Sequence, residues 1–448
     1  MKRLFLAGVA VATVLAAKPA AANGRFPESN AIFFSSTDDQ IIVARTTFGF
    51  LVSHDRGATF DWVCEQALPL QNAEDPMVAL TPAGKVIATT FSGVSVSQNG
   101  GCDWAFVGGD LDKQVFIDLA ANPNDAKDVV VFASSYDKQL EDGGIVFTSK
   151  IWETKNEGAD FTPIGTPLDP TLLGYTVDVT KTDPDRMYLS ALRNPGPMAH
   201  GYILTSKNHG TSFTETEVTF QNGERGVFIG GVDPTNADRI YVRTSNGSDK
   251  PGRLLFSDDG AATFKPIYTG QGPLLGFALS ADGSRVYVGG PKDGVQVANT
   301  SDHVFTQKSK VEIQCLASAS DGLWACSNER NGFIVALSKD EGATFQKPTH
   351  FCDIKGPLAC AAGSSVANEC VSRWPTQRST LGCDTLLPDG GLTDGGTGSD
   401  GGFPVEDNPL VEPGGGCDCR TSRATPFAAL GSFAVVAAAV VSLLRRRR

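Results

Sequence analysis

The chain has 448 residues, of which 41% are hydrophobic, and it carries 38 Lys and Arg against 50 Asp and Glu, for a net charge of -12. This length is enough for one large domain or two to three ordinary ones, with ample apolar content for a core. The acidic balance argues against nucleic-acid binding, because a phosphate-binding surface needs clustered Lys and Arg.

The first segment has the pattern of a secretory signal peptide. Lys2 and Arg3 precede an apolar stretch at residues 4–17. That stretch is short for a bilayer, which takes about 20 residues to cross. We therefore expect residues 1–22 to be removed by cleavage after Ala22, and the rest of the chain to be exported.

The middle of the chain repeats one short pattern, Ser/Thr-x-Asp/Asn-x-Gly-x-x-Phe/Trp. Five clear copies begin at residues 53, 97, 154, 206 and 338, and a sixth begins at 257 with Ala261 in place of the glycine. A degraded seventh copy is expected at residues 298–305. Successive copies start 40 to 57 residues apart, close to the size of one four-stranded propeller blade. The pattern residues are Ser53, Asp55, Gly57, Phe60, Ser97, Asn99, Gly101, Trp104, Thr154, Asn156, Gly158, Phe161, Ser206, Asn208, Gly210, Phe213, Ser257, Asp259, Phe264, Ser338, Asp340, Gly342 and Phe345.

Strand-like runs lie upstream of these copies. Three of them, at residues 186–189, 239–242 and 285–288, combine Tyr with β-branched residues and are nearly interchangeable; such residues favour strands. Pro, Asp and Gly come just before each run and suit the backbone angles of hairpin loops. The sequence thus predicts an all-β fold, a single β-propeller over residues 23–350 with seven blades as the favoured number.

The eight-residue pattern resembles the Asp-box, or BNR repeat, of sialidases, two-domain xyloglucan hydrolases and sortilin-type receptors. The resemblance implies that each copy forms the turn between the third and fourth strands of a blade, away from the face that usually carries the active site. The Asp or Asn side chain can bind backbone N–H groups of its own turn, the Gly can take a left-handed conformation, and the aromatic ring can pack between sheets. We therefore expect these residues to be structural and not catalytic.

Evidence for catalysis is sparse. A sialidase would need three arginines around a carboxylate, a Tyr–Glu pair and an acidic acid/base, and only Arg25-Phe26-Pro27 resembles a sialidase motif. Xyloglucan hydrolases place their carboxylates between two propellers, whereas this chain has blades for one. The HExxH, GxSxG and Walker motifs are absent from the sequence, and no GxGxxG lies on a strand-to-helix turn. We predict no catalytic residue, no cofactor and no metal site; an enzyme of this sequence would be a glycoside hydrolase.

Eight of the ten cysteines lie in the exported body, where an oxidising environment favours disulfides. Cys315 and Cys326 flank a four-residue hairpin loop that places them opposite each other, so we expect them to pair. A link between Cys64 and Cys102 would join neighbouring blades. The other four predict a small cysteine-rich module at residues 351–383, with three possible pairings among themselves. They are Cys352, Cys360, Cys370 and Cys383.

An acidic, glycine-rich segment follows at residues 384–419. Asp389, Asp394 and Asp400 each precede two glycines, a pattern that could suit calcium. The segment from Asp384 to Asp418 has eight acidic residues and no basic one, however, and this composition is more typical of a disordered spacer. We therefore interpret the segment as a linker.

The end of the chain, residues 420–448, has the pattern of a membrane-spanning sorting tail. Residues 424–444 are uncharged and four arginines follow them, which the positive-inside rule places in the cytoplasm. Three glycines, then Cys417 and Cys419, come just before. This order resembles the MYXO-CTERM sorting signal of myxobacterial surface proteins. The resemblance implies that a membrane protease processes the tail, that Cys417 or Cys419 is modified, and that the protein reaches the cell surface. A plain single-pass anchor is the alternative.

These elements predict an exported, surface-anchored propeller that binds a glycan or a protein without catalysis. The alternative is a sialidase-like glycoside hydrolase, which would bring three arginines, a Glu and a Tyr together at the mouth of the channel. A third possibility is a purely structural envelope protein.

Overall fold

The computed structural model describes residues 27–70, 74–141, 143–196, 198–221, 223–247 and 250–383. The predicted signal peptide, the acidic linker with Cys417 and Cys419, and the predicted membrane-spanning tail lie outside these residues. Within the described ranges, every helix is too short or too polar to cross a membrane.

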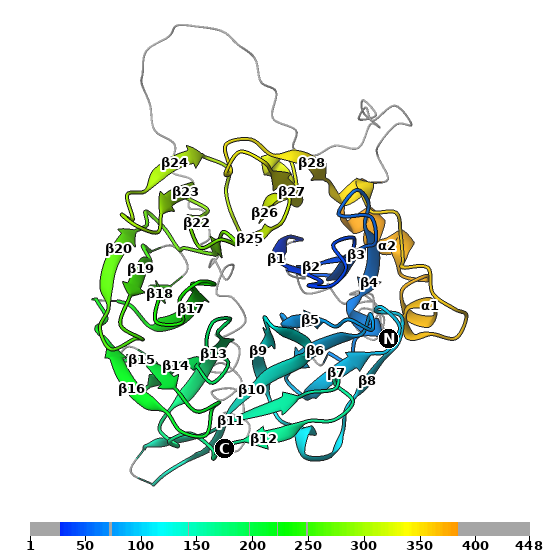
Figure 1. Ribbon diagram of the computed structural model, residues 1–448. Helices are drawn as coiled ribbons and strands as arrows, with labels where there is room; N and C mark the ends of the chain where they lie inside the picture. Colours follow the sequence, from blue (N-terminus) through cyan, green and yellow to red (C-terminus); the bar gives the residue numbers. More distant parts are fainter. Residues whose placement is uncertain are drawn as a thin grey trace, which may run out of the picture.

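Seven antiparallel sheets, each of four strands, are arranged as blades around a common axis (Figure 1). In every blade the strands are ordered as they occur in the sequence, so the chain completes one blade before it starts the next. The prediction of a seven-bladed β-propeller is confirmed.

The blades follow one another around the ring in chain order. Blade 1 consists of β1 (Ser29–Phe34), β2 (Ile42–Thr46), β3 (Gly49–Ser53) and β4 (Asp61–Cys64), and blade 2 of β5 (Val78–Leu80), β6 (Val86–Thr90), β7 (Gly93–Ser97) and β8 (Trp104–Phe106). Blade 3 consists of β9 (Phe116–Asn122), β10 (Asp125–Gln139), β11 (Ile145–Thr154) and β12 (Thr162–Ile164), and blade 4 of β13 (Leu173–Val179), β14 (Met187–Arg193), β15 (His200–Ser206) and β16 (Thr214–Val218). Blade 5 consists of β17 (Gly226–Val232), β18 (Ile240–Ser245), β19 (Arg253–Ser257) and β20 (Lys265–Thr269). Blade 6 consists of β21 (Gly276–Leu279), β22 (Arg285–Gly290), β23 (Gly294–Asn299) and β24 (Thr306–Ser309), and blade 7 of β25 (Cys315–Ala319), β26 (Gly322–Cys326), β27 (Val335–Ser338) and β28 (Gln346–Thr349).

The apolar core is divided into layers between neighbouring blades. The second and third strands of a blade are buried on both faces, so they have continuous apolar runs, as in β14. Most fourth strands are largely exposed, as in β16, whereas β4 is buried. One layer joins Phe132 of blade 3 to Leu189 of blade 4, and similar layers join the other neighbours. Each blade therefore buries its apolar faces against its neighbours.

The first and last blades meet without sharing a strand. The hydroxyl of Ser29 donates to the sulfur of Cys326 at 3.3 Å, and the rings of Phe34 and Trp324 lie 6.0 Å apart. Arg56 reaches from blade 1 to Asp321 of blade 7, with 2.9 Å between Nε and Oδ2. These side-chain contacts join blade 1 directly to blade 7.

The chain after blade 7 crosses this junction and attaches to blades 1 and 2. We call residues 351–383 the closure clamp; it includes the short helices α1 (Ser365–Glu369) and α2 (Trp374–Thr380). Trp62 of β4 forms a parallel bridge with Pro357, and the N–H of Leu358 donates to the carbonyl of Trp62 at 2.8 Å. The clamp therefore extends blade 1 at its outer edge.

Four disulfides are present among the described residues, and two of them fasten the clamp. The expected pair Cys315–Cys326 is confirmed on the hairpin β25–β26. The expected link between Cys64 and Cys102 is wrong, since the clamp runs along the outer edge of blades 1 and 2 and brings its own cysteines to both. The bonds are Cys64–Cys370, Cys102–Cys360 and Cys352–Cys383, so the module pairs internally only once.

Candidate functional site

Six turns between the third and fourth strands share one hydrogen-bond pattern. In blade 1 the hydroxyl of Ser53 accepts from the N–H of Gly57 at 2.8 Å and donates to Asp55 at 2.8 Å. Asp55 in turn accepts from the N–H of Thr59 at 2.8 Å. The equivalent hydroxyl-to-backbone bonds in blades 2, 3, 4, 5 and 7 measure 2.7 to 2.9 Å. The polar side chains of the repeat are thus bonded within their own turns.

Complementary pairs of side chains lie across these turns. Where the third position of the repeat is Asp, the residue four positions later in the chain is Thr, and its hydroxyl donates to the carboxylate. Where it is Asn in blades 2 and 3, that residue is Asp, and the amide donates to it at 2.9 and 2.8 Å. In blade 4, Asn208 donates to Ser212 at 2.9 Å. Each turn therefore matches a donor with an acceptor.

The degraded copy occupies the same place in blade 6 but has a different turn. Residues 300–305 of this copy connect β23 to β24, and the N–H of His303 donates to the carbonyl of Asn299 at 2.9 Å. Ala298 stands where the other blades have Ser or Thr, so the hydroxyl-to-backbone bond cannot form there.

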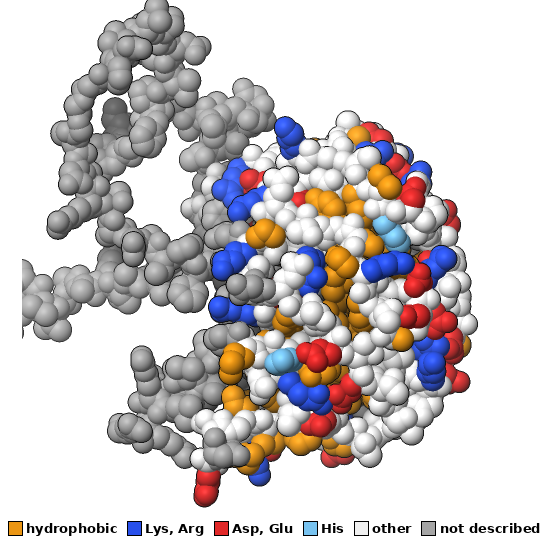
Figure 2. Space-filling view, turned by 90° about the vertical axis from the view of Figure 1, so that its left-hand side faces the viewer, with side chains coloured by type: hydrophobic (Ala, Val, Ile, Leu, Met, Phe, Trp, Pro, Cys, Tyr) orange, Lys and Arg blue, Asp and Glu red, His pale blue; other side chains and the backbone are white. Residues whose placement is uncertain are grey.

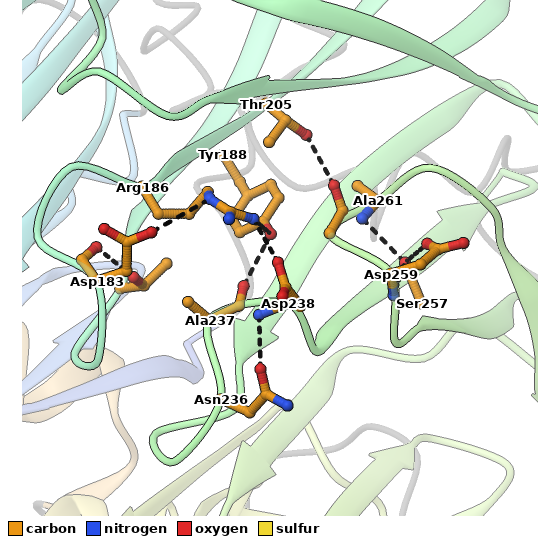
Figure 3. A network of polar contacts seen from close by, with 12 residues as sticks. Asp183, Arg186, Tyr188, Thr205, Asn236, Ala237, Asp238, Ser257, Asp259 and Ala261 are labelled. Carbon is orange, nitrogen blue, oxygen red and sulfur yellow. Dashed lines mark hydrogen bonds and ion pairs between the residues drawn. The ribbon is translucent and has the colours of Figure 1, made fainter.

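The repeat turns also contribute to contacts between neighbouring blades, as Figure 3 shows for blades 4 and 5. Arg186 reaches Asp238 of the next blade, with 2.7 Å between Nη1 and Oδ1. The hydroxyl of Tyr188 donates to the carbonyl of Ala237 at 2.8 Å, and Thr205 donates to the carbonyl of Gly260 at 3.3 Å. These polar contacts join the blades at the end of the ring where the repeat turns lie.

Two carboxyl groups line a cavity of about 250 Å³ between the innermost strands of blades 2 to 5. Asp118 lies on β9, where Oδ2 accepts the N–H of Val177 of blade 4 at 2.9 Å. Asp178 lies on β13, where the backbone N–H groups of Val179 and of Val232 in blade 5 act to lower its pKa. Asp118 therefore binds a backbone N–H group of the next blade's inner strand, and Asp178 has the backbone of the next inner strand as an electrostatic partner.

Burial raises the pKa of both groups. For Asp118 the loss of hydration outweighs the hydrogen bonds from Val177 and Leu119 and raises the pKa to about 7. The same cause raises the pKa of Asp178 to about 7. Neither residue was predicted as a site residue from the sequence, although an acidic residue inside an apolar strand run was a usable signal.

Two arginines occupy equivalent places on the second strands of blades 1 and 5. Arg45 donates to the carbonyls of Asp75 and Pro76 at 2.9 and 3.2 Å. Arg243 donates to the carbonyls of Leu274 and Leu275 at 2.8 and 2.6 Å, and burial lowers its pKa to about 10. Their guanidinium groups thus bind backbone at two different blade junctions, an arrangement unlike an arginine cluster around a ligand carboxylate.

A larger cavity of about 440 Å³ lies between blades 1 and 7, and we call it the closure pocket. Its walls are the loop between β1 and β2 and the turn between β25 and β26. The lining residues are Phe34, Ser35, Ser36, Thr37, Asp38, Asp39, Ile42, Arg56, Ser318, Ala319, Ser320, Asp321 and Trp324. Arg56 crosses the pocket and binds Asp39, Asp321 and Ser320.

Elsewhere the visible side of the ring carries mixed charges. Figure 2 shows acidic and basic side chains near one another, with small hydrophobic areas between them. Surface ion pairs include Arg193 with Glu215 at 2.7 Å and Lys265 with Asp258 at 3.2 Å. Over the described residues, the His, Cys, Asp and Glu side chains form no group of three that could hold a metal ion.

No protein family matches the sequence, and no curated protein is similar to it. Hydrazine synthase from Kuenenia stuttgartiensis is similar in structure, with 11% identity and a TM-score of 0.50 over 72% of this chain and 98% of that chain. An ancestral GH74 enzyme has 12% identity and a TM-score of 0.49. The match covers 73% of this chain but only 50% of the length of that enzyme. The GH74 xyloglucanase from Xanthomonas campestris has 12% identity and a TM-score of 0.37. The match covers 71% of this chain and 64% of the xyloglucanase chain. At these identities the likeness shows the fold alone.

Proposed function

We propose that this chain is a recognition module without catalysis, exported and held at the cell surface, that binds a glycan or a protein. The observation that carries the proposal is how the backbone surrounds the carboxyl groups of Asp118 and Asp178, which we call the channel carboxyls. Asp118 accepts the backbone N–H of Val177 in the next blade, so it acts as a brace between inner strands. The backbone of Val232 in the next blade acts on Asp178 and lowers its pKa. Arg45 and Arg243 are likewise held by backbone carbonyls.

The location of the protein at the cell surface is part of this proposal. Four disulfides suit an oxidising compartment, in agreement with a signal peptide at residues 1–22. We propose that the tail resembling MYXO-CTERM crosses the membrane at 424–444 and is processed by a sorting protease at Cys417 or Cys419. The six matching turns support membership of the Asp-box, or BNR, propellers.

A second candidate is a glycoside hydrolase, and one observation favours it. Asp118 and Asp178 line the same cavity, and the pKa of each is raised to about 7. Glycosidases need two carboxyl groups, one of them protonated near neutral pH. The pair is therefore the place to look for catalysis if turnover is found.

The test is a glycan array and a fluorogenic turnover assay on the same purified full-length protein. The turnover assay uses a sialoside and a β-glucoside, and the Asp118→Asn and Asp178→Asn variants are assayed beside the native protein. Binding to the array without turnover supports the recognition module. Turnover that falls at least about a hundredfold in either variant overturns it in favour of the enzyme.

A further inference from the structure

We propose that the closure pocket binds a neutral hexopyranoside. This inference rests on the proposed recognition function and gives that function a site and a ligand class. The pocket lies where the first and last blades meet, so both ends of the propeller chain build it. Its volume of about 440 Å³ is within the range of small-molecule sites, about 300–1,000 Å³.

The pocket has an apolar wall beside a polar rim. Phe34, Ile42, Ala319 and Trp324 supply the apolar part. Phe34 is only half-buried, whereas Trp324 is 1% exposed, and the centroids of the two rings lie 6.0 Å apart. A pyranose ring has a face of C–H groups and an equatorial belt of hydroxyls, and the C–H face packs on such an apolar wall.

The rim carries groups that can bind sugar hydroxyls. Five hydroxyl side chains lie around it, and each can donate and accept a hydrogen bond. Three carboxylates add strong acceptors. The hydroxyl residues are Ser35, Ser36, Thr37, Ser318 and Ser320, and the carboxylates belong to Asp38, Asp39 and Asp321.

The charge of the rim selects among sugars. Three carboxylates face one guanidinium, that of Arg56. Arg56 is already bound by two of the carboxylates, Asp39 and Asp321, which leaves it no unpaired charge for an anionic ligand. A sugar carboxylate would be repelled. We therefore expect a neutral hexose to bind and a sialic acid not to bind.

The site is held in place before a ligand arrives. Asp321 accepts from the indole N–H of Trp324 at 3.0 Å and from Arg56 at 2.9 Å. Although burial raises its pKa, these two hydrogen bonds hold the pKa of Asp321 below its usual value, so it stays ionised. On the opposite wall, Ser35 accepts from the N–H groups of Thr37 and Asp38 at 3.3 and 3.1 Å. A rigid rim lowers the entropy lost on binding.

The test is saturation-transfer NMR on the full-length protein in detergent micelles. The probes are the methyl glycosides of glucose, galactose and mannose, with N-acetylneuraminic acid as the anionic comparison. Ser36→Trp and Thr37→Trp each place an indole at an exposed position of the rim. Ser301→Trp is the matched control, because Ser301 is an exposed serine on the β23–β24 turn outside the pocket. Thermal melts verify that all three variants are folded.

We expect at least one neutral glycoside to bind, with its affinity lowered about tenfold or more by either rim variant and unchanged in Ser301→Trp. Binding that survives both rim variants overturns the pocket while leaving the recognition function standing. The absence of saturation transfer from every neutral glycoside, together with glycan-array binding, also overturns the pocket alone. If neither saturation transfer nor glycan-array binding is detected, both the pocket and the proposed binding of a glycan are overturned.

Discussion

Asn156 and Asp160 face each other across the turn of blade 3, with 2.8 Å between the amide nitrogen and the carboxylate oxygen. In blade 1 the same two positions hold Asp55 and Thr59, and the hydroxyl donates to the carboxylate at 2.5 Å. The direction of the hydrogen bond is therefore reversed between the two blades, and each turn needs its own partner.

We expect Asn156→Asp to destabilise the protein, because it places two carboxylates at hydrogen-bond distance. Adding Asp160→Thr should restore stability, since it recreates the pair of blade 1. The melting temperature measures both effects, and a fall on the order of 1–2 °C for the single change is expected. A double variant no more stable than the single one would contradict the pairing.

Replacing Gly57 or Gly101 by Ala distinguishes the cost of backbone strain from the cost of a steric clash. Both have a left-handed backbone, with φ of 72° and 104°. A Cβ on Gly57 would lie 2.4 Å from the ring of Trp324, whereas on Gly101 the nearest atom, of Leu358, is 3.6 Å away. We expect Gly57→Ala to cost about 1–3 kcal/mol more than Gly101→Ala in the free energy of unfolding. Denaturant titration of the two variants measures the difference; equal costs would show that strain alone matters.

The two clamp disulfides should be redundant. Cys64–Cys370 and Cys102–Cys360 tie the same segment to blades 1 and 2, so either bond alone keeps the ring closed. We expect replacing both pairs by Ser to lower the free energy of unfolding by about 1–3 kcal/mol more than the sum of the two separate replacements.

Chemical denaturation of the two paired variants and the quadruple variant measures this coupling. The matched control replaces Cys315 and Cys326, which are only 11 residues apart in sequence, together with either clamp pair. These combinations should be additive. Additivity in the quadruple variant as well would refute the redundancy.

The channel carboxyls make stability depend on pH. The pKa of Asp118 is about 7 in the folded protein and about 3.9 in an unfolded chain. The folded state therefore holds the proton more tightly, so its contribution to stability is fully present below about pH 4 and is lost as the pH rises through about 7. The same sign holds for Asp178.

Asp118→Asn removes this titration and keeps an oxygen that can accept the N–H of Val177. We expect the free energy of unfolding of this variant to fall less between pH 4 and 8 than that of the native protein, and the double variant with Asp178→Asn to fall less still. Urea titrations across this range are the measurement. An unchanged slope in the double variant would mean that burial does not raise these pKa values.

The sequence by itself determined the fold and the repeated turns. A propeller blade is built from neighbouring strands, and the bonds of each turn span only four residues, as between Ser53 and Gly57. The period of the pattern therefore gave the size and position of the blades. The hairpin bond Cys315–Cys326 was predictable for the same reason, since its partners are close in sequence.

Only the tertiary structure decided the features that join distant parts of the chain. Cys64 and Cys370 are 306 residues apart, and nothing local distinguishes this pairing from one with Cys102. The carboxyl of Asp118 has a backbone partner only because β9 and β13 lie side by side at the centre of the ring. The closure pocket likewise exists only because the first and last blades meet. Local hydrogen bonds and strand propensity are written in short stretches of sequence, whereas these contacts arise from the circular packing of seven blades.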